Sequence, residues 1–317
     1  MRASTQALSL LAGPLNVEVL RALEEEPRSL IDLRREIGFP PQTTMRAHLR
    51  RLERAGVLER NREAGFPGSV DYALSPCGQE LGEVARGFEH WLEASPHGSC
   101  PLGSSAAKSV LKALAGGWSA GILRAIGARP MALTELSRLI SSLNYPSLER
   151  RLAALRLAGL IEASPGSGRG RPYRPSEWLR RAVGPLTQAA AWERRHLPGA
   201  AIGRIDVEAA FLLAIPLLHL PEEISGFARL AVEVPGESGR RLAGVMVEVR
   251  EGEIASCLAR LEGQADGWAC GSAGAWLEAV VEGEAAALEV GGDCELAGAV
   301  VEGLNRELFA GVRAEAS

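Results

Sequence analysis

The sequence lacks several features that would assign it to a common class at once. Its 317 residues include only five cysteines and 5% aromatic residues, and among 35 basic residues only Lys108 and Lys112 are not arginine. The longest apolar run, Ala209–Leu220, holds twelve residues, whereas a membrane-spanning helix needs about 20. We therefore expect no membrane span, and we interpret the apolar stretch Ala7–Ala12 as a helix start and not as a signal peptide.

The cysteines form no C-x-x-C pair and are scattered: Cys77, Cys100, Cys257, Cys270 and Cys294. We expect reduced thiols and a cytoplasmic protein. His90, His97 and Cys100 lie within eleven residues, but no fourth ligand is near, so a metal site is not predicted. Gly271–Gly274 lacks the G-x-S-x-G spacing of a nucleophile turn. We therefore predict no cofactor and no enzymatic activity.

Charge is divided very unevenly along the chain, although the net value is only −4. Residues 1–100 carry −2, residues 101–199 carry +10 and residues 200–317 carry −12. A block of +10 is attracted to phosphate, and a block of −12 is repelled by it. The sequence therefore indicates a nucleic-acid-binding middle and an acidic C-terminal third that does not itself favour DNA.

The stretch 40–72 has the pattern of a DNA-reading element. Met45, Leu49 and Leu52 share one face of a predicted helix, and an earlier helix places Leu30, Leu33 and Ile37 on one face. Two short strands, 57–62 and 69–74, follow around the Gly- and Pro-containing loop 64–68. The order of helix, turn, helix and hairpin predicts a winged helix-turn-helix.

The polar face of the second helix offers groups that can read base edges. Glutamine can pair with adenine and arginine with guanine, while threonine can hold a phosphate. The alternative is a solvated helix face, but its position before a hairpin favours DNA contact. The candidate DNA-binding residues here are Gln42, Thr43, Thr44, Arg46, His48, Arg50, Arg51 and Arg62.

The chain repeats itself. Shifted by 103 residues, Leu11–Glu59 aligns with Leu114–Glu162 without a gap, and 16 of 49 positions are identical. After the hairpin the offset becomes 101, since Tyr72 then matches Tyr173 and Ser75 matches Ser176. Most identities are predicted core positions, so we expect the same domain twice. Each copy ends in a helix, opened by Ser75 or Ser176 as N-cap.

The second copy is expected to contact DNA differently. Its polar helix face includes Glu149, which repels phosphate, whereas its hairpin contains Arg169-Gly170-Arg171-Pro172. Such a basic loop either enters the minor groove or touches phosphates only. The candidate DNA-binding residues of this copy are Tyr145, Arg150, Arg151, Arg169, Arg171 and Arg174.

Specific motifs relate both copies to a known family. They are Leu11-Ala12-Gly13, Leu33-Arg34-Arg35-Glu36-Ile37, the run Leu49–Arg60 and Asp71–Gly78, with partial counterparts in the second copy. Both copies resemble HxlR-type winged-helix bacterial transcription regulators. The resemblance implies operator binding, which in that family uses homodimers of single-domain chains. Two fused domains depart from this pattern and suggest an intramolecular pseudo-dimer.

The last third is acidic and aliphatic. Its pattern predicts a helix at 205–220, strands at 229–234, 244–250 and 286–290, and helices at 274–281 and 294–309, the last capped by Asp293. Asp266–Ser272, Trp276–Gly283 and Leu288–Asp293 resemble the sterol-carrier-protein-like domain. That resemblance implies an apolar ligand site, for which the candidate wall residues are Phe211, Leu212, Leu217, Trp268 and Trp276, although a plain core role is open for each.

The sequence as a whole predicts an α+β protein. The expected domains are a first winged helix-turn-helix (1–95), a linker (96–109), a second winged helix-turn-helix (110–198) and a ligand-sensing α+β domain (199–317). The favoured function is a DNA-binding transcriptional regulator controlled by an apolar small molecule, acting as a monomer with pseudo-two-fold symmetry or as a homodimer. The alternative is a ligand-binding or assembly protein whose winged helices contact other proteins.

Overall fold

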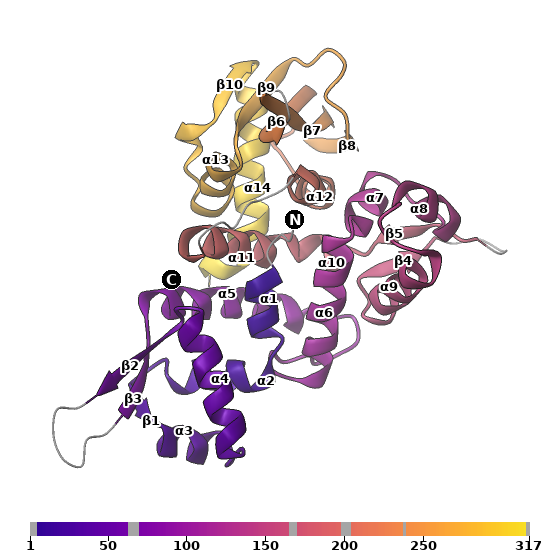
Figure 1. Ribbon diagram of the computed structural model, residues 1–317. Coiled ribbons are helices and arrows are strands. Elements are labelled where there is room, and N and C mark those ends of the chain that lie inside the picture. The colour runs from indigo at the N-terminus through magenta and orange to yellow at the C-terminus, as the bar shows by residue number, and fades with distance from the viewer. Residues whose placement is uncertain (1–4, 63–69, 165–169, 198–203, 237–238, 315–317) are drawn as a thin grey trace. The chain divides into compact units, whose positions relative to one another are not determined.

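The computed structural model describes residues 5–62, 70–164, 170–197, 204–236 and 239–314. The chain separates into two compact units. The N-terminal unit is built from Ser4–Lys112 and Trp192–Ala200, and the C-terminal unit from Ala113–Ala191 and Ala201–Ser317. Each unit is considered by itself (Figure 1).

The N-terminal unit is mainly helical, with one small sheet. Its elements are α1 (Thr5–Leu11), α2 (Pro14–Ala22), β1 (Arg28–Ser29), α3 (Leu30–Glu36), α4 (Gln42–Arg54), β2 (Leu58–Arg62), β3 (Val70–Leu74), α5 (Pro76–Glu93), the first part of α6 (Ser105–Ser119) and the end of α11 (Val183–His196). The strand order is β1-β3-β2, fully antiparallel, with Arg60 opposite Tyr72.

Side-chain caps define where these helices begin. The Ser29 hydroxyl accepts the N–H of Asp32 at 3.2 Å and starts α3. The Ser75 hydroxyl accepts the N–H of Gly78 at 3.0 Å and lies 2.5 Å from the carbonyl oxygen of Gly56. The predicted N-cap at Ser75 is therefore confirmed, and it also ties the start of α5 to the turn that ends α4.

The predicted linker 96–109 is more ordered than its composition suggests. Cys100 and Leu102 are buried, and α6 already begins at Ser105. The end of α11 also packs within the N-terminal unit. Its Trp192 ring N–H donates to the carbonyl of Cys77 at 2.9 Å, and Glu193 accepts the backbone N–H of Ala7 at 2.8 Å.

The C-terminal unit combines a helical part with a five-stranded sheet. Its helical part holds the end of α6, α7 (Ile122–Ala128), α8 (Leu133–Leu139), α9 (Tyr145–Leu157), β4 (Ile161–Ala163), β5 (Tyr173–Pro175), α10 (Glu177–Arg181) and the start of α11. Then follow α12 (Arg204–Ala214), the 3-10 turn η1 (Ile215–Leu217), β6 (Gly226–Gly236), β7 (Gly239–Arg250), β8 (Glu253–Leu258), β9 (Gly267–Ser272), α13 (Ala273–Leu277), the π turn η2 (Glu278–Glu282), the 3-10 turn η3 (Ala285–Ala287), β10 (Glu289–Gly292) and α14 (Cys294–Ala314).

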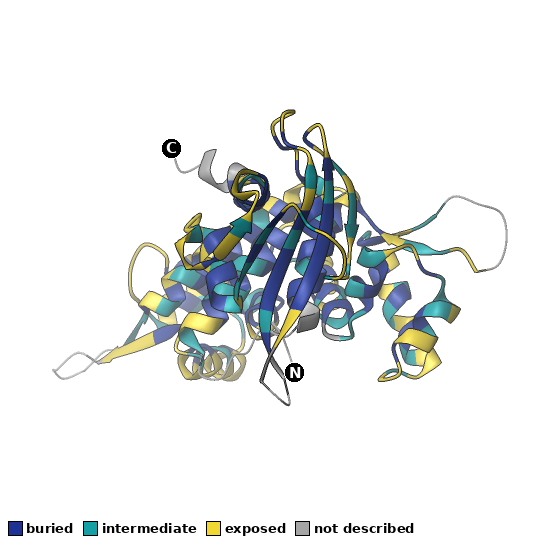
Figure 2. Ribbon diagram, turned by 90° about the horizontal axis from the view of Figure 1, so that it is seen from above, coloured by how far each residue is buried: buried dark blue, intermediate teal, exposed yellow. Residues whose placement is uncertain are grey.

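The large sheet has the order β10-β9-β6-β7-β8, in which only β6 and β9 are parallel. Alternate residues of β6 and β7, such as Leu230, Val232, Val245 and Val247, are fully buried and form the core of this layer (Figure 2). Asp293 accepts the N–H groups of Glu295 and Leu296, so the predicted cap of α14 is confirmed.

Several predicted boundaries in the last third were wrong. The helix predicted to reach residue 220 ends at Ala214, because Pro216 lacks a backbone N–H and disfavours helix before it. The strand predicted at 286–290 begins only at Glu289 and follows a 3-10 turn. Strands β8 and β9 were not predicted, because β8 holds a single β-branched residue, Ile254, and β9 contains Gly267 and Gly271. Among the described helices, none is both long and apolar enough to cross a bilayer.

Candidate nucleic-acid interface

The candidate interface is the pair of helices α3 and α4 with the hairpin β2–β3. Between the helices the chain turns at Gly38 and Phe39, both with positive φ (83° and 58°). Met45, Leu49 and Leu52 are buried beneath α4, as the spacing predicts. Because these three side chains are packed in the core, the opposite face of α4 points away from it.

That outward face carries most of the predicted DNA-binding side chains. Gln42, Thr43, Thr44, Arg46 and Arg50 are all exposed. Within the described part of the chain, neither Arg46 nor Arg50 has an ion pair or side-chain hydrogen bond. Their guanidinium groups are free to meet phosphate or a guanine edge.

His48 and Arg51 have partners inside the protein. The His48 Nδ1 atom lies 2.7 Å from the side-chain oxygen of the buried Asn16. Arg51 donates to the hydroxyl of Ser9 at 2.7 Å. Burial, followed by the nearby Arg51 charge, lowers the pKa of His48. These two side chains therefore join α4 to α2 and α1, although Arg51 remains exposed.

The hairpin β2–β3 supplies the wing. Its strands pair from Leu58 opposite Leu74 to Arg62 opposite Val70, and Arg60 is exposed on β2. Arg28, on the neighbouring strand β1, pairs with Glu36 at 2.6 Å and so joins the sheet to the end of α3. The predicted loop 64–68 and the side chain of Arg62 lie outside the described residues.

In the C-terminal unit, α8, α9 and the hairpin β4–β5 carry the remaining predicted DNA-binding residues. Tyr145, Arg150 and Arg171 are exposed. Arg151 donates to the carbonyl of Gly116 at 2.6 Å, and Arg174 pairs with Glu162 at 3.0 Å. Of the predicted basic loop, Arg169 lies outside the described residues, whereas Gly170, Arg171 and Pro172 are described. Two of these arginines are therefore engaged within the protein.

The five predicted ligand-wall residues do not line one common space. Phe211 and Leu212 are buried in α12, and the Phe211 ring meets Trp276 edge-on at 4.8 Å between ring centroids. The Trp276 ring N–H donates to the carbonyl of Ala231 at 2.8 Å. Trp268 alternates with the buried Ala269 on β9 and so faces the opposite side of the sheet.

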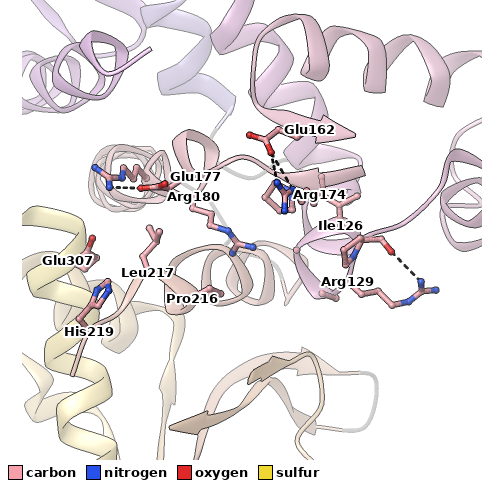
Figure 3. A pocket seen from close by; sticks show the side chains of 15 residues that line it. Ile126, Arg129, Glu162, Arg174, Glu177, Arg180, Pro216, Leu217, His219 and Glu307 are labelled. Carbon is pink, nitrogen blue, oxygen red and sulfur yellow. Dashed lines mark hydrogen bonds and ion pairs between the residues drawn. The ribbon is translucent and has the colours of Figure 1, made fainter. Parts of the chain in front are cut away.

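Leu217, the fifth of these residues, does line a pocket in the C-terminal unit (Figure 3). The pocket has a volume of about 650 Å³, and the end of α7, the segment around β5 and α10, η1 and α14 surround it. Its lining is rich in charge, including Arg129, Arg174, Arg180, Arg181, Glu162, Glu177 and Glu307. Sequence reasoning missed this site, because its parts are distant in the chain.

Taken together, α3, the turn, α4 and the β2–β3 wing define the class of the N-terminal region as a winged helix-turn-helix. The comparisons with known proteins agree with this class. Residues 10–97 match the family model described as HxlR-like helix-turn-helix. An uncharacterised HTH-type transcriptional regulator, YtfH, of Escherichia coli is 31% identical over 90 residues, which span 28% of this chain and 71% of that protein. The chain belongs to the HxlR-like helix-turn-helix family.

The same match is found to YtfH of Shigella flexneri. Two solved structures are also similar, each at 25% identity and a TM-score of 0.27. One is described as a transcriptional regulator of the MarR family from Enterococcus faecalis and covers 27% of this chain. The other is diamide-treated YodB from Bacillus subtilis and covers 28%. The matched regions span 79% of the first of those chains and 88% of the second. The family implies DNA binding by a regulator, a class that is usually not enzymatic.

Proposed function

We propose that the protein is a sequence-specific transcriptional regulator that reads DNA through the exposed face of α4. The observation that carries the proposal is that Arg46 and Arg50 have no partner among the described residues, on a helix whose other face is buried through Met45, Leu49 and Leu52. In a helix-turn-helix the second helix enters the major groove. Gln42 and Thr43 at its N-terminal end would then meet base edges and phosphate.

We further propose that residues 110–198 are a second winged helix-turn-helix. The order α7-α8-α9-β4-β5-α10 repeats the order α2-α3-α4-β2-β3-α5. The caps also correspond, since the Ser176 hydroxyl lies 2.8 Å from the carbonyl oxygen of Gly159 and accepts the N–H of Leu179. This is the same arrangement that Ser75 makes with Gly56 and Gly78.

The two copies would divide the work within one pseudo-dimeric chain. In the first copy, Arg46 and Arg50 have no partner within the described part of the chain, so this copy would specify the sequence. In the second copy Arg151 and Arg174 have partners within the protein and Glu149 opposes phosphate, so it clamps the backbone through exposed cations such as Arg171. The predicted minor-groove insertion of Arg169 belongs to the same proposal.

The acidic last third would control this activity through a bound small molecule. The resemblance to sterol-carrier-protein-like domains and the α+β layering of helices on a five-stranded sheet support a ligand-binding role. The Phe211 ring packs on Trp276 and Leu212 lies against Gly127, so an apolar ligand would enter beside Leu217, which lines an open pocket. We also propose the domain limits predicted from the sequence, with residues 199–317 as the ligand-sensing domain.

Selection from a random pool of duplexes, followed by hydroxyl-radical footprinting with the full chain, tests the proposed function. We expect an enriched motif whose two halves are protected unequally, because one copy reads bases and the other holds phosphates. Equal protection of two identical half-sites would contradict the division of work. Failure to enrich any motif at low salt, where phosphate contacts are strongest, would refute DNA reading itself.

A protein-contact role for α8 and α9 is the second candidate. It is favoured by three exposed apolar side chains on these helices, Leu139, Tyr145 and Leu157, of which Leu157 is 77% exposed. At the position of Leu157 the first copy has Arg54, and at that of Leu139 it has Glu36. The test is the variant Leu157→Arg. If this variant no longer binds a partner protein that the wild type binds, while its DNA footprint is unchanged, the result favours this role.

A further inference from the structure

Among the described residues, one arginine in the pocket of the C-terminal unit has no acidic side chain as a partner. The other three arginines of its lining are paired: Arg129 with Glu135 at 3.0 Å, Arg174 with Glu162 at 3.0 Å and Arg181 with Glu177 at 2.6 Å. Within the described residues, Arg180 has no carboxylate partner. A cation held in a largely buried place without a counter-charge attracts an anion.

Arg180 is held in a fixed orientation. Its Nη1 atom donates to the carbonyl oxygens of Leu212 (3.0 Å) and Leu213 (3.2 Å), in the last turn of α12. Its remaining N–H groups have no partner among the described residues, and its side chain points toward the middle of the pocket (Figure 3). Burial lowers the pKa of the guanidinium. The group is thus positioned before any ligand arrives.

The rest of the lining limits the size and polarity of what can bind. The volume of about 650 Å³ is in the range of small-molecule sites. Ile126, Pro216 and Leu217 offer apolar surface. Glu307 and His219 also line the pocket, and in the described part of the chain Glu307 has no ion pair. A second negative charge on the ligand would be repelled by Glu307.

We propose that this pocket binds a small organic monocarboxylate, with the carboxylate on Arg180 and an apolar body against Pro216 and Leu217. The planar guanidinium fork suits a carboxylate better than a single point charge does. The site refines the proposed ligand control, and its regulatory meaning rests on that function. The ligand class is amphipathic instead of wholly apolar.

The pocket is built partly from the second copy, since residues within 126–130 and 174–181 contribute to its lining, and α12 adds a further link to that copy. The positive charge of Arg180 compensates the partial negative charge at the C-terminal end of α12, and a bound carboxylate would compete for that same positive charge. α12 packs on α7, where Gly127 lies against Leu212 and where Arg124 pairs with the buried Glu208. Ligand binding would therefore affect α7, which is the helix that begins the core of the second copy.

Calorimetric titration of the full chain without DNA tests the proposal. Benzoate and 3-phenylpropionate are compared with their neutral amides, and phthalate supplies the second charge. We expect each monocarboxylate to bind at least about tenfold more tightly than its amide, a difference of about 1.4 kcal/mol. We also expect it to bind more tightly than phthalate.

Three variants locate the binding. Arg180→Lys keeps the charge but loses the fork, so carboxylate affinity should fall about tenfold. Leu217→Trp fills the pocket from an apolar wall and should abolish binding without touching Arg180. Arg138→Gln removes a charge from α8, outside the pocket lining, and should bind as the wild type does. Circular dichroism verifies folding, and Leu217→Trp stands as an independent test if Arg180→Lys is unstable.

The proposal is overturned if neither carboxylate binds at about 10 mM, if the amides bind equally well, or if Arg138→Gln weakens binding as much as Arg180→Lys. DNA binding is measured separately. Carboxylate binding by a chain that fails to bind DNA would refute the proposed function and leave this site standing. If the chain binds DNA but does not bind carboxylates, the proposed function stands and the carboxylate site is refuted.

Discussion

Replacing Arg46 and Arg50 together by alanine should remove sequence-specific DNA binding while leaving the fold intact. Both side chains are exposed on α4 and have no partner within the described protein. Exposed substitutions of this kind usually change stability by no more than about 0.5 kcal/mol. Alanine also has a high helix propensity, so α4 should persist. The loss of affinity can then be assigned to the interface.

The magnitude follows from the kind of contact that each arginine makes. A good contact to a base edge is worth about 1–3 kcal/mol, so two such contacts give about 2–6 kcal/mol, or a loss of roughly 30-fold and more. A contact to phosphate instead reduces the salt slope of log K by about 0.9 for each arginine. A decrease of up to about 1.8 in that slope is therefore the limit for phosphate contacts alone.

Fluorescence anisotropy with the selected duplex at several salt concentrations measures both quantities. The matched control is Arg54→Ala with Arg86→Ala, which removes the same charge. Arg54 lies at the C-terminal end of α4, and Arg86 is on α5, where it pairs with Glu24. We expect the control to lose little specific affinity. If the control and the Arg46/Arg50 variant lose equal affinity, with equal slopes, the face of α4 has no special role and the reasoning fails.

Three further predictions concern other parts of the molecule. Arg171→Ala should lower DNA affinity almost equally for all sequences and reduce the salt slope by about 0.9, measured in the same titration; a change in sequence preference would contradict its assignment to phosphate. The pKa of His48 is lowered by burial and by Arg51, so its contribution to stability is complete above a pH of about 6.5 and is lost as the pH falls through the lowered value. The urea midpoint should therefore fall more between pH 7 and pH 5 in the wild type than in His48→Gln. An equal fall of the midpoint in both proteins would refute this. Ser75→Ala should cost about 1–2 kcal/mol in urea unfolding, because the cap on Gly78 is lost; an unchanged midpoint would show that water replaces it.

The fold of the first domain could be predicted from local sequence because local physics specifies it. Met45, Leu49 and Leu52 recur at helical spacing, and all three are buried. Ser75 precedes a proline in the first turn of a helix, and it is the N-cap. These signals need no knowledge of distant residues.

The candidate site was only partly predictable, because exposure and pairing depend on distant groups. His48 and Arg51 share the polar face of α4 with Arg50 in sequence terms. Their partners, Asn16 and Ser9, are more than thirty residues away, and nothing in the helical pattern indicates them. In the same way, the pairing of Arg174 with Glu162 follows from strand register and not from composition.

The sequence by itself determined the winged helix-turn-helix of the first copy, the internal repeat and the uneven charge, because each is written in spacing, identity or composition. Only the tertiary structure decided which cations are free. It showed that Phe211 packs on Trp276, and it brought Arg180 and Leu217 to one pocket. A side chain's partner depends on chain segments that meet only when the core forms, and no local pattern encodes that meeting.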